Sequence, residues 1–152
     1  MKKIILASAS PRRREIMQQA GYRFEIMVSH KEEVYHSSEP AEIVRELSLL
    51  KAEDIAERVE QKNVVIIGAD TVVAHNGRIL GKPKDYDDAF SMIDSIQGET
   101  HYVYTGVTVI SFDESGERTV VNDAVGTKVF VDPMTEEEIH AYLGTGEHKD
   151  KA

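Results

Sequence analysis

The chain has 152 residues, of which 41% are hydrophobic and 30% are charged, and its formal net charge is −9. This length allows one domain with a hydrophobic core, and the composition is typical of a soluble globular protein. The negative charge disfavours binding to duplex nucleic acid, which needs a basic surface. The apolar runs are too short to cross a membrane, and the N-terminus lacks the pattern of a signal peptide. Because cysteine is absent, disulfides and thiolate chemistry are excluded, and we expect a cytoplasmic protein.

Strand and helix signals alternate in the first part of the chain. Ser10 and Pro11 suit the N-cap and the first position of a helix that runs to about Ala20, before Gly21. A second helix is predicted from Pro40 to about Val59, where apolar residues recur at helical spacing. Three strands are predicted around these helices, over Lys3–Ala7, Tyr22–Val28 and Asn63–Gly68.

The second part of the chain adds hairpin signals. Asn76-Gly77 lies between two apolar runs, which is typical of a tight β-hairpin. The last helix is predicted to begin at Pro133, with Thr135 as its N-cap and Glu138 placed for a capping box. Between them we predict a helix over Tyr86–Gln97 and long strands over Glu99–Phe112 and Arg118–Val131. Helix-linked strands together with hairpins indicate an α/β fold with a mixed sheet, and the absence of linkers or repeats indicates one domain over residues 1–152.

The stretch SASPRRR joins the first predicted strand to the first predicted helix. Ser8 and Ser10 supply hydroxyl groups there, and the helix start offers free N–H groups and the positive end of its dipole. Arg12 and Arg13 add positive charge, which is unfavourable in a first helical turn unless an anion offsets it. A bound phosphate would do so. The alternative is that Ser10 only caps the helix while the arginines face water.

The stretch IIGADTVV places Asp70 directly after a buried run. Carboxylates at the ends of buried strands are frequent catalytic groups in α/β sheets. The alternative is a turn aspartate that binds nearby backbone N–H groups, although the β-branched Thr71 is a poor turn residue. This stretch alone leaves both interpretations open.

Further charged groups and one glycine carry weaker signals. The acidic pair Glu32-Glu33 could join Asp70 in holding a hard divalent cation, or it could be a solvated loop. Lys82 in LGKPKD could bind phosphate as a point charge, although lysines in such loops usually face water. The histidines show no zinc-ligand spacing. Gly106, within a predicted strand, indicates either a close approach of backbone or ligand or a bulge.

Five motifs in order, SASPRR, IGADTVV, LGKPKD, HYVYTGV and the final DKA, resemble the Maf family of nucleotide pyrophosphatases, which was named for an association with septum formation. The resemblance implies an enzyme that uses Mg²⁺ or Mn²⁺ to hydrolyse a nucleoside triphosphate to the monophosphate and diphosphate. It also implies a twisted mixed sheet with flanking helices, related to the inosine-triphosphate pyrophosphatases, and a homodimer.

The resemblance also implies roles for individual residues. Asp70 matches the catalytic proton acceptor, and Glu32 matches the acidic position that holds metal with it, with Glu33 as the alternative. Arg12 together with Thr71 resembles the branch that acts on dTTP and UTP, with modified pyrimidine nucleotides as further substrates, rather than the branch that prefers 7-methyl-GTP. Lys82 matches the family's loop lysine and is expected to be catalytic together with Asp70 and Glu32. The remaining substrate-facing matches are Ser8, Arg13, Lys51, Asp150 and Lys151.

The family pattern continues beyond DKA with a Gly-rich segment that includes a base-contacting Gln. Because this sequence stops at Ala152, we expect that segment to be missing from it. Two other interpretations remain beside the enzyme: a non-catalytic nucleotide-binding regulator linked to septum formation, and a folded but inactive fragment.

Overall fold

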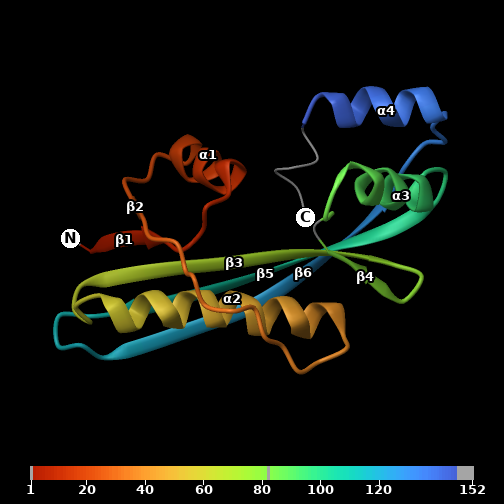
Figure 1. Ribbon diagram of the computed structural model, residues 1–152. Coiled ribbons are helices and arrows are strands. Elements are labelled where there is room, and N and C mark those ends of the chain that lie inside the picture. Colours follow the sequence, from red (N-terminus) through yellow and green to blue (C-terminus); the bar gives the residue numbers. More distant parts are fainter. Residues whose placement is uncertain (1, 82, 147–152) are drawn as a thin grey trace. The chain divides into compact units, whose positions relative to one another are not determined.

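Figure 1 shows the computed structural model of the chain, which describes residues 2–81 and 83–146. The elements in chain order are β1 (Lys3–Leu6), α1 (Pro11–Gln19), β2 (Glu25–Ile26), α2 (Pro40–Arg58), β3 (Val64–His75), β4 (Arg78–Leu80), α3 (Tyr86–Ile96), β5 (Thr100–Phe112), β6 (Arg118–Phe130) and α4 (Glu136–Gly144). Within these described ranges, no helix combines the length and the apolar character needed to span a membrane.

The sheet is mixed, which confirms the predicted fold class. In the described part of the chain, six strands run in the order β2-β1-β3-β5-β6, with β4 paired to β3 outside this path. Strand β1 is parallel to both neighbours, with Ile5 opposite Glu25 on β2 and opposite Ile66 on β3. Strand β4 is antiparallel to β3 and closes the hairpin predicted at Asn76-Gly77. Both turn residues have positive φ, as the favoured two-residue hairpin turn requires.

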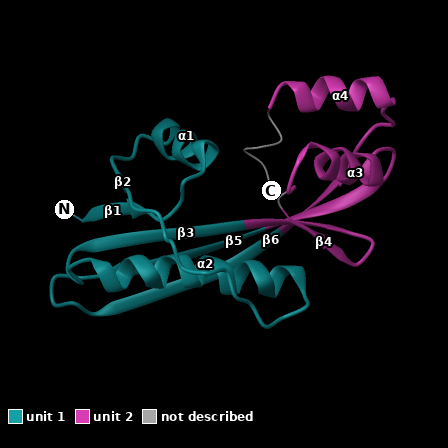
Figure 2. Cartoon of the chain, viewed as in Figure 1, with its two compact units in different colours: residues 1–70, 105–125 teal, residues 71–104, 126–152 magenta. Residues whose placement is uncertain are grey.

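The chain forms two compact units, drawn in different colours in Figure 2. Unit 1 comprises residues 1–70 and 105–125, and unit 2 comprises residues 71–104 and 126–152. In unit 2, the facing sides of α3 and α4 bury Ala89, Ile139 and Leu143. The predicted capping box is present at the start of α4, where Thr135 and Glu138 each accept a hydrogen bond from the other's backbone N–H.

In unit 1, α2 packs closely along the sheet, as Figure 2 shows. A Cβ atom added at Gly68 on β3 would lie less than 3.0 Å from the Ser48 carbonyl oxygen, and one at Gly106 would collide with the backbone of Val44. Gly106 therefore marks a close approach of the α2 backbone, one of the alternatives that the sequence left open. The buried apolar core of this unit is Ile5, Ala7, Ala52, Ile55, Ala56, Val64, Ile66, Ile110 and Phe112.

Three predicted boundaries were wrong. The strand predicted over Tyr22–Val28 shrinks to β2, which stops at Ile26 because Ile26 lies opposite Leu6, the last residue of β1. The strand predicted to end at Gly68 continues to His75, because its second half pairs with β4. Asp70 thus lies inside β3, just past the point where its pairing with β1 stops at Ile67. Helix α4 begins at Glu136 rather than Pro133, because Thr135 caps it and stays outside the helix.

Candidate functional site

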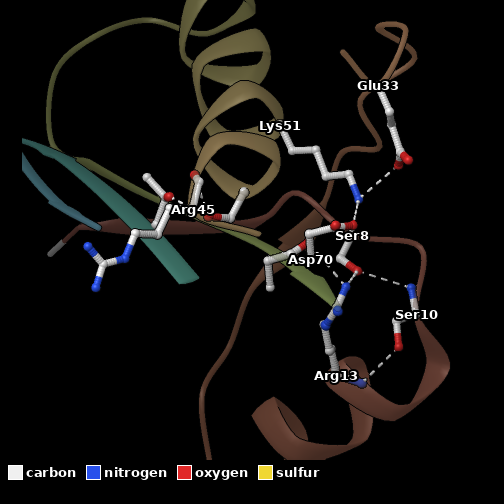
Figure 3. Close-up of polar contacts among 10 residues, drawn as sticks. Ser8, Ser10, Arg13, Glu33, Arg45, Lys51 and Asp70 are labelled. Carbon is white, nitrogen blue, oxygen red and sulfur yellow. Dashed lines mark hydrogen bonds and ion pairs between the residues drawn. The ribbon is translucent and has the colours of Figure 1, made fainter. Parts of the chain in front are cut away.

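The SASPRRR stretch folds into a hydrogen-bonded corner between β1 and α1 (Figure 3). The Ser10 side chain caps α1 by accepting a hydrogen bond from the Arg13 backbone N–H at 3.4 Å, as predicted. The Ser8 hydroxyl oxygen accepts from the Ser10 N–H at 3.2 Å and from Arg13 Nη1 at 3.1 Å. Arg13 Nη1 also donates to the Ala69 carbonyl oxygen on β3 at 3.2 Å. These contacts fix the Arg13 guanidinium against the strand that carries Asp70.

A second group of charges converges on Asp70 from α2 and from the segment after β2. Lys51 Nζ donates to Asp70 Oδ1 at 2.6 Å and lies 3.2 Å from Glu33 Oε1, so one ammonium bridges two carboxylates (Figure 3). The Asp70 side chain is 12% exposed and that of Lys51 19%, whereas that of Glu33 is 58% exposed. Asp70 and Lys51 therefore form a largely buried ion pair, whereas Glu33 faces solvent.

Opposing effects act on the ionisation of Asp70 and Arg13 in this cluster. Burial raises the pKa of Asp70, and the charge of Glu33 raises it further, while the hydrogen bond and charge of Lys51 and the charge of Arg13 lower it. Burial also lowers the pKa of Arg13, an effect that the charge of Asp70 opposes. A carboxyl whose pKa is moved by burial and by specific charged partners is a common feature of functional sites.

The structure gathers several of the predicted site residues. Ser8, Arg13, Lys51 and Asp70 form the cluster just described, all within unit 1. Glu33, the alternative to Glu32, makes the contact with Lys51.

Other predicted residues lie elsewhere. Arg12 is exposed on the first turn of α1, and Thr71 follows Asp70 on β3 as the first residue of unit 2. Lys82, Asp150 and Lys151 lie outside the described residues. The Ala69 carbonyl was not predicted as a contact of Arg13, since no side-chain pattern marks a backbone acceptor.

The carboxylates of this cluster are the groups that could bind a divalent cation. Among residues 2–81 and 83–146, no set of three or more His, Asp or Glu side chains is placed to enclose a metal ion. Glu33 and Asp70, however, direct one oxygen each toward a single cation, the Lys51 ammonium. Mg²⁺ is commonly held by one or two carboxylates, with substrate phosphates and water completing the shell. The pair therefore fits a substrate-assisted divalent cation and does not fit a structural zinc site.

Comparison with known proteins identifies the family. The Maf-like protein family matches residues 3–152. A dTTP/UTP pyrophosphatase of Lachnoclostridium phytofermentans is 49% identical over 100% of this chain and 77% of its own length. One of Alkaliphilus metalliredigens is 46% identical over 100% of this chain and 77% of its own length.

A solved structure resembles the fold. The Staphylococcus aureus Ham1 protein superposes with a TM-score of 0.54 at 13% identity, over 84% of this chain and 72% of its own. At that identity the likeness concerns the fold, and it agrees with the fold that the resemblance implied. The family match over almost the whole chain and the identity to curated relatives settle the classification: the chain belongs to the Maf family.

Proposed function

We propose that this protein hydrolyses dTTP and UTP to the nucleoside monophosphate and diphosphate. The reaction and substrates are those in the names of the relatives that are 49% and 46% identical to it. The observation that carries the proposal is the placement of Asp70, a largely buried carboxylate held by Lys51 and adjoining Arg13. Attack of water on a polyanionic triphosphate needs both positive charge and a base. The cations neutralise the phosphates, and the base accepts a proton from the water.

Each contact in the cluster suggests a task. Asp70 accepts the proton of the attacking water, and its raised pKa makes it a stronger base than an ordinary aspartate. Arg13 and Lys51 neutralise charge on the triphosphate. The Ser8 oxygen already accepts two hydrogen bonds, so its own hydroxyl hydrogen is available to donate to a phosphate oxygen. Arg12 and Thr71 remain the proposed base-selecting residues, Lys82 remains a proposed catalytic residue, and Asp150 and Lys151 remain proposed substrate contacts.

We further propose that Glu33 and Asp70 hold a divalent cation, Mg²⁺ or Mn²⁺. Glu33 takes the role that the resemblance assigned to Glu32, because Glu33 is the residue that shares Lys51 with Asp70. When bound, such a cation supplies positive charge at the cleaved phosphoanhydride and lowers the pKa of a nearby water.

One experiment separates the enzyme from a non-catalytic nucleotide-binding regulator. The protein is incubated with UTP, dTTP, 7-methyl-GTP and ATP in Mg²⁺ or Mn²⁺, and diphosphate release and binding are both measured. We expect diphosphate release, fastest with UTP and dTTP. Binding without release would support the regulator instead. A regulator has no need of a buried carboxylate beside the phosphates, whereas a hydrolase does.

A further inference from the structure

Lys51 contacts the two carboxylate oxygens to which the proposed function assigns a divalent cation. Its ammonium lies 2.6 Å from Asp70 Oδ1 and 3.2 Å from Glu33 Oε1 (Figure 3). We propose that Lys51 and the divalent cation compete for these oxygens, so that the cation binds tightly only after the phosphates of the nucleotide have drawn Lys51 away. This inference rests on the proposed function and adds to it an order of binding.

The competition follows from charge and space. A divalent ion bound to both Asp70 Oδ1 and Glu33 Oε1 would have to take the position between these two oxygens that the Lys51 ammonium now occupies. Two positive charges a few ångströms apart in a largely buried site repel strongly, because water screens them poorly there. The Lys51 and Asp70 side chains are only 19% and 12% exposed, so solvent offers little relief. One of the two cations must therefore leave.

Lys51 is the cation that can move. Arg13, the other cation acting on Asp70, is tied to the Ser8 hydroxyl and to the Ala69 carbonyl. Lys51 reaches Asp70 on a flexible stem of four carbons, and its ammonium contacts the carboxylates of Asp70 and Glu33. A triphosphate offers the ammonium an alternative anionic partner, so nucleotide binding releases the two carboxylates at the moment when the cation is needed. The protein would thus discriminate against loading metal without substrate.

The main test measures Mn²⁺ binding without nucleotide, by electron paramagnetic resonance of the free ion. We expect Lys51→Met to bind Mn²⁺ roughly tenfold more tightly than the unmodified protein, because a like charge at ion-pair distance has been removed. Lys3→Met is the matched control, since Lys3 also pairs with a glutamate of unit 1, but at the surface. It should leave Mn²⁺ affinity unchanged. Equal or weaker Mn²⁺ binding by Lys51→Met would overturn the inference.

A rescue separates charge from packing. Because the chain has no cysteine, Lys51→Cys can be alkylated at that position alone. Aminoethylation restores an ammonium at the end of a lysine-like stem and should return Mn²⁺ affinity to the weak value of the unmodified protein. If the neutral cysteine form and the aminoethylated form bind Mn²⁺ equally well, charge competition is wrong.

A second measurement uses the unmodified protein and so does not depend on any variant folding. The rate at which an N-hydroxysuccinimide ester acylates Lys51 is followed by mass spectrometry as Mg²⁺ is added, with Lys3 as the internal reference. Displacement from Asp70 should raise the Lys51 rate as Mg²⁺ binds; an unchanged rate at saturating Mg²⁺ would contradict the proposal. If the protein releases diphosphate but Lys51 and the divalent cation do not compete, only this inference is overturned. If neither the unmodified protein nor any Lys51 variant releases diphosphate or binds the metal, the proposed function is overturned.

Discussion

Helix α2 carries two polar clusters on neighbouring turns, and they are built in opposite ways. Around Ser48 the groups are neutral and satisfied. The Ser48 and Thr108 hydroxyls lie 2.8 Å apart, and Asn122 Nδ2 donates to Thr108 Oγ1 at 2.7 Å and to the Arg45 carbonyl at 3.0 Å. Both hydroxyl residues are completely buried. This network joins α2, β5 and β6, and nothing in it depends on a charge.

Around Lys51 the groups are charged, and their environment opposes their ionisation. Burial raises the pKa of Asp70 and lowers that of Arg13, although each favours the charge of the other. A hydrogen-bonded neutral network stabilises a fold, whereas buried charges cost stability unless they are fully paired. One helix therefore supports both purposes: Ser48 belongs to a structural network, and Lys51 belongs to the cluster that is expected to do chemistry. Substitutions in each cluster should therefore affect different properties.

The largest effect is expected for Asp70→Asn. Replacing the proposed base should slow diphosphate release from UTP by about 10²–10⁴-fold, the usual contribution of a general base. Stability should not fall, because the variant removes a charge that burial disfavours. The matched control is Asp54→Asn, since Asp54 is a buried aspartate of the same unit that pairs with Arg58 at 3.7 Å. Near-normal release by Asp70→Asn would refute its assigned role.

Thr108→Val should lower stability and leave activity near normal, the reverse of the result expected for Asp70→Asn. It keeps the shape of the side chain but takes a partner from Ser48 and from Asn122, which should cost about 1–3 kcal/mol of unfolding free energy. Diphosphate release per folded molecule should stay near normal, because the Thr108 hydroxyl is hydrogen-bonded to Ser48 and Asn122, outside the charged cluster. Urea unfolding and a rate measured well below the melting temperature test the two parts separately. A folded variant with lost activity would show that the two clusters are coupled.

The sequence predicted those parts of the fold that local chemistry decides. Ser10 and Pro11 marked the start of α1, and Thr135 with Glu138 marked the cap of α4, because capping involves residues three positions apart. Boundaries decided by distant partners were missed. Strand β2 ends where β1 ends, at the pair Leu6 and Ile26, and β3 is long because β4 pairs with its second half. A propensity pattern contains no information about where a partner strand ends.

The candidate site also has residues that the sequence predicted and residues that it could not predict. The family resemblance pointed to Ser8, Arg13, Lys51 and Asp70, and the structure brings them together. Glu32 and Glu33 could not be ranked from sequence, since they are adjacent in an irregular segment with no periodicity to orient them. The Ser48 network was missed altogether, because its members are polar residues from three distant parts of the chain. Homodimer assembly and cytoplasmic location stay predictions.

A pH dependence of stability should follow from Asp70. Its pKa in the folded protein lies above the ordinary value of 3.8, so the stability given by the protonated carboxyl is fully present below pH 3.8. This stability is lost as pH rises through the folded pKa. The unfolding free energy of the unmodified protein minus that of Asp70→Asn should therefore decrease with rising pH and then level off. Urea unfolding of both proteins at a series of pH values upward from 3.8 measures this difference. A difference in unfolding free energy that increases with pH would contradict the assigned burial of Asp70.

The smallest effect is expected at the surface. Lys3 and Glu25 form an ion pair at 3.1 Å on neighbouring strands of unit 1, with side chains 53% and 60% exposed. A double-mutant cycle of Lys3→Met and Glu25→Gln should give a coupling energy of about 1 kcal/mol or less, because water screens the pair and both side chains lose freedom. The pair carries the same signs of charge as Lys51 and Asp70 but is far more exposed. A coupling energy of several kcal/mol at Lys3 would mean that burial is not what distinguishes the Lys51 cluster from a surface pair.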